Sequence, residues 1–369
     1  MSKRVIILGV TGSIGGNAVD VVLSHPGEFQ VAAVSALRRR EECEAVAKRL
    51  GAKAYIGEDA ALRAVEENDA DVCLVATVGL SGLKPTLAAI EKGMDVALAT
   101  KEVLVMAGEL VRRRAEARGV RILPVDSEHS AVFQCIQGCR VDEVDRITLT
   151  ASGGPFLDEP ADLSAVTVEQ ALNHPRWRMG PKVTVDSATM MNKGFEIVEA
   201  SWFFGVPAGR IDVVVHPESI VHSLVTMVDG ATLAQLSVPD MRVAIQYALS
   251  WPRRFRSERA RLDLAALGAL TFRAPDERRF PCIRLAREAI AAGGLAPAVL
   301  AAADELAVAA FLEGRIGFMD IPRLVERALG SVPAGACDSE ASVAAAVNAA
   351  KSAFAAEFGS APGKLEANS

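Results

Sequence analysis

The sequence predicts an α/β protein that begins with a Rossmann-like, doubly wound parallel sheet and ends in an α-helical domain. Three observations predict this class. Short apolar runs alternate with helical patterns in the first third of the chain. Longer strand-like runs, typical of an α+β domain, begin near Val141, and residues 283–358 are rich in Ala and Leu. Strands that alternate with helices indicate βαβ units and a parallel sheet.

The N-terminal domain is expected over residues 1–126. Its expected strands are RVIILGV, QVAAVSA, DVCLVAT, DVALAT and VRILPV. Its expected helices cover residues 13–24, 41–50, 83–92 and 102–118.

The middle domain is expected over residues 127–255. Two strand-like runs predict an open or antiparallel sheet there, namely RITLTASGGPF and RIDVVVHPESIVHSLVTMVDGATLAQLSV. The segment between them, about 152–182, is rich in Gly and Pro, and a loop this long in a compact domain is usually a lid or a binding element. Beyond this domain we expect a connector over 256–282, a helical domain over 283–358 and a disordered tail over 359–369.

Composition excludes several classes of protein. Half of the 369 residues are hydrophobic and the net charge is −6, which indicates a globular chain and disfavours a general nucleic-acid binder. The six cysteines are scattered without a CxxC pair, so we expect neither a disulfide framework nor a zinc site. No run is long and apolar enough to span a membrane, and the N-terminus begins a strand without a signal-like segment. We therefore expect a cytoplasmic protein.

A glycine turn follows the first expected strand. VIILGVTGSIGG places Gly9, Gly12 and Gly15 where a helix would begin. Glycines at this point let the backbone turn tightly and approach a pyrophosphate, which then binds free N–H groups of the helix. The spacing is GxxGxxG and not GxGxxG, but its place inside a βαβ unit favours a dinucleotide site. The alternative is a turn without a ligand.

Arginines occupy the end of the second expected strand. NAD binders usually carry an acid there, whereas this chain has Arg38, Arg39 and Arg40 before its first acid, Glu41. Arginines suit a ribose 2′-phosphate, so the sequence favours NADP(H). The alternative is the solvated start of a helix.

Two carboxylates lie close together in PVDSEHSAVFQ, at the end of another expected strand. Asp126 and Glu128 would repel each other without a partner. Three interpretations remain open: a solvated loop, a helix start with ordinary capping, or a hard-cation site such as Mg²⁺ prefers.

A second group of polar residues lies in VDSATMMNKGFEIVEASWFF. A helix from about Met190 brings Asn192, Lys193 and Glu196 to one face, with Glu199 one turn further. A surface Lys–Glu pair is the alternative. Bulky apolar neighbours favour burial, and buried charges need partners.

A third cluster is dispersed through the long loop, at Ser152, His174, Trp177, Lys182 and Ser187. Hydroxyls, a lysine and an imidazole together can hold a phosphate by charge-assisted hydrogen bonds. Individually, a serine in such a loop is usually a turn residue, and a lone histidine is more often structural than functional.

Together these motifs resemble the 1-deoxy-D-xylulose 5-phosphate reductoisomerase family of non-mevalonate isoprenoid biosynthesis. The similar segments are GVTGSIG, PVDSEHSAVFQ, ASGGPF, NHPRWRMG, VDSATMMNKGFE, HPESIVHS, SVPDMR, PCIRLAREAIAAGG and AAADELAVAAFLEGRIGF. The resemblance implies an NADPH-binding domain, a catalytic domain with a mobile flap and a C-terminal helical domain, in a homodimer. The implied reaction is a metal-assisted carbon–carbon rearrangement followed by hydride transfer from NADPH, which gives 2-C-methyl-D-erythritol 4-phosphate.

The resemblance also implies roles for individual residues. The ligands of Mg²⁺, Mn²⁺ or Co²⁺ would be Asp126, Glu128 and Glu196. The substrate would be bound by Ser127, Ser152, His174, Trp177, Ser187, Asn192, Lys193, His222 and Met241, with Glu199 in support. NADPH would be bound by Gly9, Thr11, Gly12, Ser13, Ile14, Gly15, Arg38, Arg39, Thr100, Lys101 and Glu102. The catalytic group would be Lys101, Asp126, Glu128, Glu196 and Trp177, the flap residue over the reacting carbons.

The chain departs from the family pattern at four places. Val10 replaces a common Ser, Thr100 a usual Asn, and Arg39 a frequent Asn, while AAADE replaces a run like NAANE. None is a proposed metal ligand, so these changes bear on affinity and kinetics. Two other functions are compatible with these motifs: a different NADP-dependent, metal-using enzyme such as a ketol-acid reductoisomerase, and a catalytically silent NADP-binding sensor.

Overall fold

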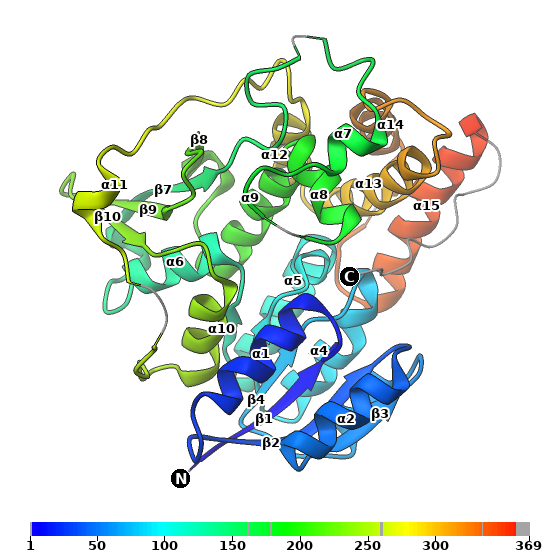
Figure 1. The fold of residues 1–369 in the computed structure, drawn as a ribbon. Coiled ribbons are helices and arrows are strands. Elements are labelled where there is room, and N and C mark those ends of the chain that lie inside the picture. Colours follow the sequence, from blue (N-terminus) through cyan, green and yellow to red (C-terminus); the bar gives the residue numbers. More distant parts are fainter. Residues whose placement is uncertain (1, 161, 178, 259–260, 334, 359–369) are drawn as a thin grey trace. The chain divides into compact units, whose positions relative to one another are not determined.

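The computed structural model describes residues 2–160, 162–177, 179–258, 261–333 and 335–358. The chain separates into two compact units (Figure 1). Unit 1 comprises residues 1–103, 110–137 and 235–263, and unit 2 comprises residues 104–109, 138–234 and 264–369. The tail predicted over 359–369 lies outside the described residues.

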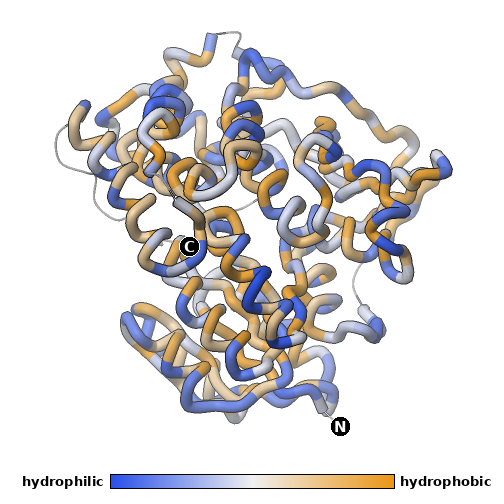
Figure 2. Tube along the Cα trace, turned by 180° about the vertical axis from the view of Figure 1, so that it is seen from behind, coloured by the Kyte–Doolittle hydropathy of each residue, from blue (hydrophilic) through white to orange (hydrophobic). Residues whose placement is uncertain are grey.

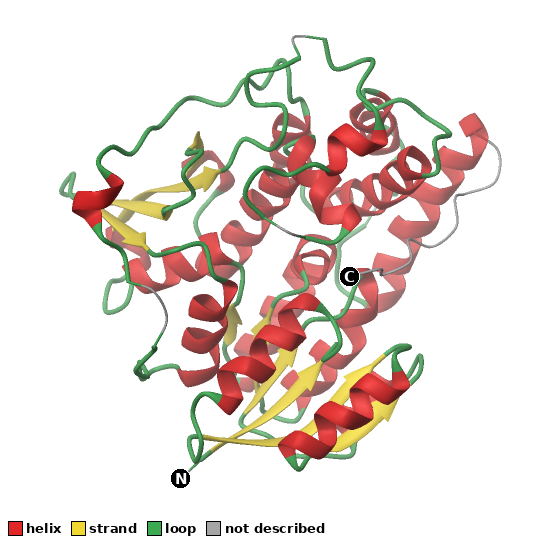
Figure 3. Ribbon diagram, viewed as in Figure 1, coloured by secondary structure: helices red, strands yellow, loops and turns green. Residues whose placement is uncertain are grey.

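Unit 1 is built on a six-stranded parallel sheet with strand order β3-β2-β1-β4-β5-β6 (Figure 3). Its strands are β1 (Lys3–Leu8), β2 (Phe29–Ala36), β3 (Lys53–Ile56), β4 (Val72–Val75), β5 (Asp95–Leu98) and β6 (Ile122–Pro124). This order reverses direction between β1 and β4, which is where doubly wound sheets bind their ligands. The predicted Rossmann-like class is therefore confirmed.

Helices connect these strands as the alternating pattern predicts. They are α1 (Ser13–Leu23), α2 (Arg40–Leu50), α3 (Ala60–Glu66), α4 (Leu83–Glu91), α5 (Lys101–Arg118) and α6 (Ser127–Cys135), with a short 3₁₀ helix over Gly79–Gly82. The sequence analysis did not predict β3 or α3, because both are short and β3 is only partly buried. In α5, Ala107 has non-helical backbone angles.

The core of unit 1 includes a helix that is distant in sequence. Val5 and Ile7 of β1 are fully buried, as expected where helices cover both faces of a parallel sheet. Helix α10 (Met241–Ser250) contributes Ile245 and Leu249 to the same core. A segment beyond residue 234 thus completes the hydrophobic core of the N-terminal sheet.

Unit 2 contains a four-stranded sheet in the order β10-β9-β7-β8. Its strands are β7 (Val144–Ala151), β8 (Ile211–Val215), β9 (Val221–Met227) and β10 (Thr232–Leu236), the last of which extends into unit 1. β7 pairs antiparallel with β9 but parallel with β8. The sheet is therefore mixed, because the chain between β7 and β8 forms a helical crossover and not a hairpin.

The remaining elements of unit 2 are mainly helical. They are α7 (Val168–Leu172), α8 (Pro181–Ala188), α9 (Met191–Phe204), α11 (Leu264–Leu267), α12 (Cys282–Ala292), α13 (Ala296–Leu312), α14 (Asp320–Leu329) and α15 (Glu340–Phe358), with 3₁₀ turns over Val141–Glu143 and Ala208–Arg210. The predicted C-terminal helices are confirmed. The segment expected as a loop over 152–182 contains α7, whose start is stabilised by a capping box between Thr167 and Gln170.

Hydrophobic and hydrophilic residues alternate along the trace of each unit (Figure 2). None of the six cysteines, which all lie among the described residues, is in a disulfide. Among the described residues, no helix has the length and apolar character that crossing a membrane requires.

The burial of α10 gives a stability prediction. Ile245→Ala removes a fully buried side chain from the core of unit 1, so we expect it to lower the free energy of unfolding by about 2–5 kcal/mol. Leu37→Ala, at a residue that is 56% exposed, should change it by less than about 0.5 kcal/mol. Urea unfolding of both variants checks the difference. Equal midpoints would show that α10 does not stabilise this core.

Candidate active site

The glycine turn after β1 has the close backbone contacts that the motif predicts. Gly9 has φ of +80°, and a Cβ atom there would lie 2.2 Å from the carbonyl oxygen of Ala76 at the end of β4. A Cβ at Gly15 would lie 2.2 Å from the carbonyl oxygen of Gly9. Glycine is therefore required at both positions to bring β1, α1 and β4 together.

The start of α1 fits a phosphate group. Gly12 is the N-cap residue and supplies no side-chain cap, and the first backbone hydrogen bond inside the helix is from Gly16 N–H to the Gly12 carbonyl. The N–H groups of Ser13, Ile14 and Gly15 precede that bond and have no partner within the helix. Such N–H groups, with the helix dipole, bind anions.

The three arginines after β2 differ in whether they fit a ribose 2′-phosphate site or the solvated start of a helix. The Arg39 guanidinium donates to the Thr11 carbonyl oxygen at 2.9 Å, so this side chain reaches back to the glycine turn. The Arg40 side chain instead pairs with Glu44 along α2 at 3.2 Å, as a solvated helix start would. Arg38 is exposed. Arg39 is thus the arginine best placed beside a nucleotide bound at the turn.

Thr100, Lys101 and Glu102 lie at the start of α5. The buried Thr100 hydroxyl donates to the Thr77 carbonyl oxygen at 2.7 Å, which joins the loop after β4 to the start of α5. Lys101 and Glu102 are partly exposed in the first turn of the helix. A direct contact between Thr100 and the cofactor remains a prediction.

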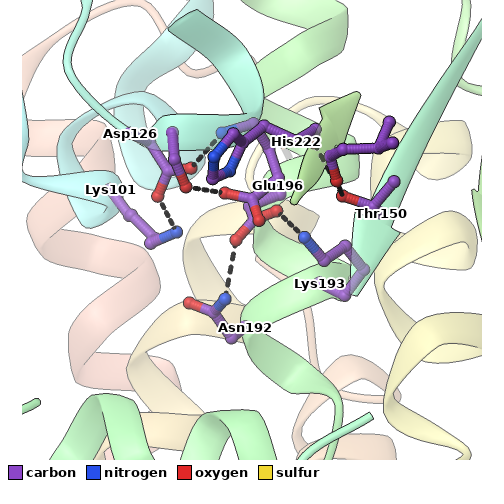
Figure 4. Close-up of polar contacts among 10 residues, drawn as sticks. Lys101, Asp126, Thr150, Asn192, Lys193, Glu196 and His222 are labelled. Carbon is purple, nitrogen blue, oxygen red and sulfur yellow. Dashed lines mark hydrogen bonds and ion pairs between the residues drawn. The ribbon is translucent and has the colours of Figure 1, made fainter. Parts of the chain in front are cut away.

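Asp126 is the N-cap of α6, so the capping interpretation is correct for this residue. One carboxylate oxygen accepts from the backbone N–H of Glu128 at 3.2 Å, and the other accepts from the Lys101 ammonium group (Figure 4). The Glu128 carboxylate accepts from the hydroxyl of Ser127. Both carboxylates therefore lie at a helix N-terminus, where the dipole stabilises negative charge. A carboxylate offers roughly four lone-pair sites, which is more than these contacts use.

The electrostatics of Asp126 favour the ionised form. Burial by itself would raise the pKa of this carboxyl group. The Lys101 ammonium, the ring of His129 and hydrogen bonds with Glu128 and Lys101 outweigh burial and hold the pKa of Asp126 far below its ordinary value. A carboxylate that stays ionised can act as a metal ligand without first losing a proton.

Glu196 is held in a buried polar cluster on α9. Its side chain is 1% exposed and that of Lys193 is 4% exposed, and the two form an ion pair (Figure 4). The Asn192 amide donates to the other carboxylate oxygen of Glu196 at 2.6 Å. The helix that the sequence predicts from about Met190 is confirmed, and the surface-pair alternative is wrong, because α9 is buried along most of its length.

A strained junction precedes this cluster. Met190 lies between α8 and α9 with φ of +62°, which is unfavourable for a residue with a side chain. It is 3% exposed, so its surroundings fix this conformation. The junction turns the chain between Ser187 on α8 and Asn192 on α9.

The ASGGPF segment holds Ser152 and closely approaches α8. Gly154 has φ of +65°, and a Cβ atom there would lie 2.7 Å from the Ser187 carbonyl oxygen. Its N–H donates to the Ser152 hydroxyl at 3.3 Å. Glycine at this position thus brings two of the predicted phosphate-binding serines into one region of unit 2.

His174 is joined to Ser152, and its hydrogen bonds define its tautomer. Its Nδ1 atom accepts from the backbone N–H groups of Arg176 at 3.1 Å and Trp177 at 2.9 Å. Nδ1 is therefore unprotonated, so Nε2 carries the hydrogen and donates to the Ser152 hydroxyl at 3.1 Å. Burial lowers the pKa of His174, which favours this neutral form. Trp177 is partly buried.

Lys182 differs from the other members of the third cluster. Its ammonium group lies 2.5 Å from Asp186 and 2.8 Å from Asp304, and the Asp304 side chain is fully buried. Two carboxylates thus already pair with this lysine, and one of them comes from α13, far away in the sequence. A contact between Lys182 and a phosphate stays a prediction.

The other predicted residues are distributed over both units. His222 is buried on β9, and its carbonyl oxygen accepts from the Thr150 hydroxyl at 2.7 Å (Figure 4). Glu199 is buried on α9, and Met241 is partly buried at the start of α10. The sequence analysis gave no role to Thr150 or His129, although His129 lies within PVDSEHS, beside two acids.

Comparisons with known proteins agree with this geometry. Family models match three parts of the chain: "1-deoxy-D-xylulose 5-phosphate reductoisomerase" over 5–54 and 40–108, its "C-terminal domain" over 122–204, and "DXP reductoisomerase C-terminal domain" over 236–356. A relative of that name from Chlorobium chlorochromatii is 50% identical over 351 residues, covering 89% of this chain and 92% of its own. The chain belongs to the 1-deoxy-D-xylulose 5-phosphate reductoisomerase family.

Solved structures of this family have the same fold. The Zymomonas mobilis enzyme in complex with NADPH has a TM-score of 0.91 at 41% identity, covering 97% of this chain and 99% of its own. A second, described as a complex with NADPH, fosmidomycin and magnesium, has a TM-score of 0.89 at 36% identity, covering 96% and 98%. The predicted family and fold are confirmed, and the chain is an NADP-dependent oxidoreductase.

The glycine turn gives a prediction with a matched control. Gly15→Ala places a methyl group against the Gly9 carbonyl, so we expect NADPH affinity to fall by at least about tenfold as the turn is displaced. Gly16→Ala, at the next residue, meets no atom within 4 Å and should bind NADPH normally. Fluorescence titration with NADPH measures both. Equal affinities would remove the turn from the cofactor site.

The arginines give a prediction about cofactor choice. Arg39→Ala should weaken NADPH binding about 10- to 100-fold, as expected for the loss of a charge-assisted hydrogen bond, and leave NADH binding nearly unchanged. Arg40→Ala is the control, because its side chain pairs with Glu44. Dissociation constants for both cofactors test this, and a parallel loss for NADH would contradict a role at the 2′-phosphate.

The tautomer of His174 gives a pH prediction. In the folded protein the pKa of His174 lies below the ordinary value of 6.5. As the pH falls, this histidine is therefore protonated in the unfolded chain before it is protonated in the folded one, and the folded protein loses stability. We expect ¹H–¹⁵N spectra of histidine-labelled protein to show His174 neutral and protonated on Nε2 at neutral pH. The spectrum of His174→Asn assigns the signal. A proton on Nδ1 would contradict the hydrogen bonds described here.

Proposed function

We propose that the protein converts 1-deoxy-D-xylulose 5-phosphate to 2-C-methyl-D-erythritol 4-phosphate with NADPH and a divalent cation, in non-mevalonate isoprenoid biosynthesis. One observation carries this proposal: a relative named for that activity is 50% identical over most of both chains. The related structures that contain NADPH and magnesium support the choice of cofactors. A ketol-acid reductoisomerase is disfavoured by the same identity.

The proposed metal ligands are Asp126, Glu128 and Glu196. Carboxylates suit a hard cation such as Mg²⁺, and Mn²⁺ or Co²⁺ accept the same ligands. Within unit 1, Lys101 keeps Asp126 ionised and the start of α6 orients it. Within unit 2, Lys193 and Asn192 fix the carboxylate of Glu196. These contacts orient the side chains of the proposed ligands, as polar neighbours commonly do at metal sites.

When bound, the cation supplies Lewis-acid stabilisation of charged substrate oxygens and NADPH supplies the hydride. The chain's own residues bind and orient the substrate. The hydroxyls of Ser152 and Ser187 and the amide of Asn192 are proposed to bind its phosphate and hydroxyl groups. Such contacts, remote from the reacting carbons, provide binding energy that can offset the cost of closing the site.

Trp177 is proposed to cover the reacting carbons, with Met241 as a second apolar contact. His174 fixes the local turn, because its Nδ1 accepts from the backbone N–H of Trp177 itself. A closed apolar cover excludes water and protects a charged intermediate from unwanted protonation. Glu199 and His222 are proposed to support the site from buried positions on α9 and β9.

We also propose that the protein is a cytoplasmic homodimer, as the composition and the family resemblance predict. Large apolar side chains that are exposed in unit 2 support a partner surface, since Val228 is 65%, Leu264 62% and Phe272 47% exposed. Sedimentation velocity measures the oligomeric state, and a monomer at micromolar concentration would contradict the dimer.

The decisive experiment follows the near-ultraviolet absorbance of NADPH during incubation with 1-deoxy-D-xylulose 5-phosphate and Mg²⁺. We expect oxidation that stops when EDTA is added and is much slower with NADH. Identification of methylerythritol phosphate by mass spectrometry establishes the product. Tight NADPH binding by folded protein without any turnover would favour the silent sensor instead.

The metal site gives a separate prediction. Glu128→Gln removes one ligand charge from a partly exposed side chain, so we expect the Mg²⁺ concentration for half-maximal activity to rise at least about tenfold while NADPH affinity is unchanged. Glu169→Gln changes an exposed acid on α7 and serves as the control. An unaltered Mg²⁺ dependence in Glu128→Gln would remove this residue from the metal site.

A further inference from the structure

His216 is a fully buried histidine that the proposed mechanism does not use. It follows β8 directly, in HPESIVHS. Its Nε2 atom accepts from the backbone N–H groups of Ile220 and Val221, each at 3.1 Å. Nε2 is therefore unprotonated and Nδ1 carries the hydrogen, which points to the Thr271 carbonyl oxygen at 2.9 Å and to Glu218 at 3.0 Å.

The ring and backbone of His216 are held from several directions. Phe272 stacks on the imidazole with ring centroids 4.7 Å apart and planes inclined by 15°. The backbone N–H of His216 donates to the Ala151 carbonyl at 2.7 Å, directly before Ser152. The Thr271 hydroxyl donates to Glu218 at 2.7 Å. This histidine thus joins the end of β7 to the connector segment.

The imidazole determines the conformation of the turn formed by residues 216–221. Ser219 in this turn has φ of +54°, which is unfavourable for a residue with a side chain. Ile220 and Val221 are buried, so water does not replace a lost partner of their backbone N–H groups. Without the Nε2 atom, these two N–H groups would have no hydrogen-bond acceptor. The acceptor atom of His216 therefore stabilises a turn that its backbone alone disfavours.

The other side of this turn contacts the flap. The Arg176 side chain donates through Nε to the Pro217 carbonyl oxygen at 3.2 Å. Arg176 is also one of the two residues whose N–H groups bind His174. The flap residues 174–177 are thus held at two points. Within the flap, the His174 ring binds backbone N–H groups, and outside it the Pro217 carbonyl oxygen binds the Arg176 side chain.

We propose that His216 is a positioning residue, which fixes the 216–221 turn so that the Pro217 carbonyl docks the flap through Arg176. The inference rests on the proposed function, because the flap covers the substrate only in that reaction. Displacement of the turn should raise the KM for 1-deoxy-D-xylulose 5-phosphate. NADPH affinity should not change, since the glycine turn belongs to unit 1.

Two substitutions test the roles of the two ring nitrogen atoms of His216 separately. His216→Gln can place a carbonyl oxygen near the Nε2 position and so still accept from the turn. His216→Asn can keep the donor at the Nδ1 position but offers no acceptor to Ile220 and Val221. We expect KM to rise about tenfold in His216→Asn and to stay within about threefold of wild type in His216→Gln. Equal KM values for the two variants would overturn the proposal.

A double-mutant cycle with Arg176→Ala tests the route through the flap. If His216 acts by placing Pro217, the losses in kcat/KM of His216→Asn and Arg176→Ala will not add. Arg323→Ala, an exposed arginine of α14 beside Asp320, is the control and should combine additively. Additive losses for Arg176→Ala would overturn the proposal. Arg176→Ala alone, at an exposed residue, should raise KM severalfold even if His216→Asn does not fold, and an unchanged KM would count against docking.

A readout independent of turnover separates this inference from the proposed function. We expect limited proteolysis within residues 162–177 to be faster in His216→Asn than in wild type and slower again in His216→Gln. If wild type shows no turnover, the proposed function fails while this order still tests the turn. If turnover is normal and the three proteins are cleaved equally fast, the positioning role fails alone.

Discussion

Paired opposite charges are the constraint on which the candidate site depends. Asp126 accepts from Lys101, and Glu196 accepts from the nearly buried Lys193, each within its own unit. A buried carboxylate without a partner would cost several kcal/mol, so each helix that carries one must also bring a cation or N–H donors. The start of α6 meets this need with its own N–H groups and Lys101, and α9 meets it with residues one turn apart.

Glycines supply the complementary constraint, which is close approach of backbones. Gly9 and Gly15 allow β1, α1 and β4 to meet at the point where the strand order reverses, and Gly154 allows the segment after β7 to approach α8. In both units the proposed consequence is a binding site. Backbone N–H groups at the start of α1 and hydroxyls near α8 are left where anionic groups of ligands can bind them.

Histidines have a different task in unit 2. His174 and His216 each use one nitrogen to accept two backbone N–H groups and the other to donate. In this arrangement an imidazole acts as a rigid cross-link for a turn of the chain. From the sequence, a lone histidine is expected to be structural more often than functional, but only its hydrogen-bond partners decide which nitrogen is available.

The sequence by itself determined the Rossmann-like class, the glycine turn, the helix of Asn192 and Glu196, and the family, because these depend on local periodicity and on motifs of adjacent residues. It did not determine that α10 completes the core of unit 1, that β7 and β8 are parallel, or that Asp304 neutralises Lys182. It also did not identify His216. Those features depend on residues that are far apart in sequence, and only tertiary packing brings such partners together and decides which buried polar atoms are satisfied.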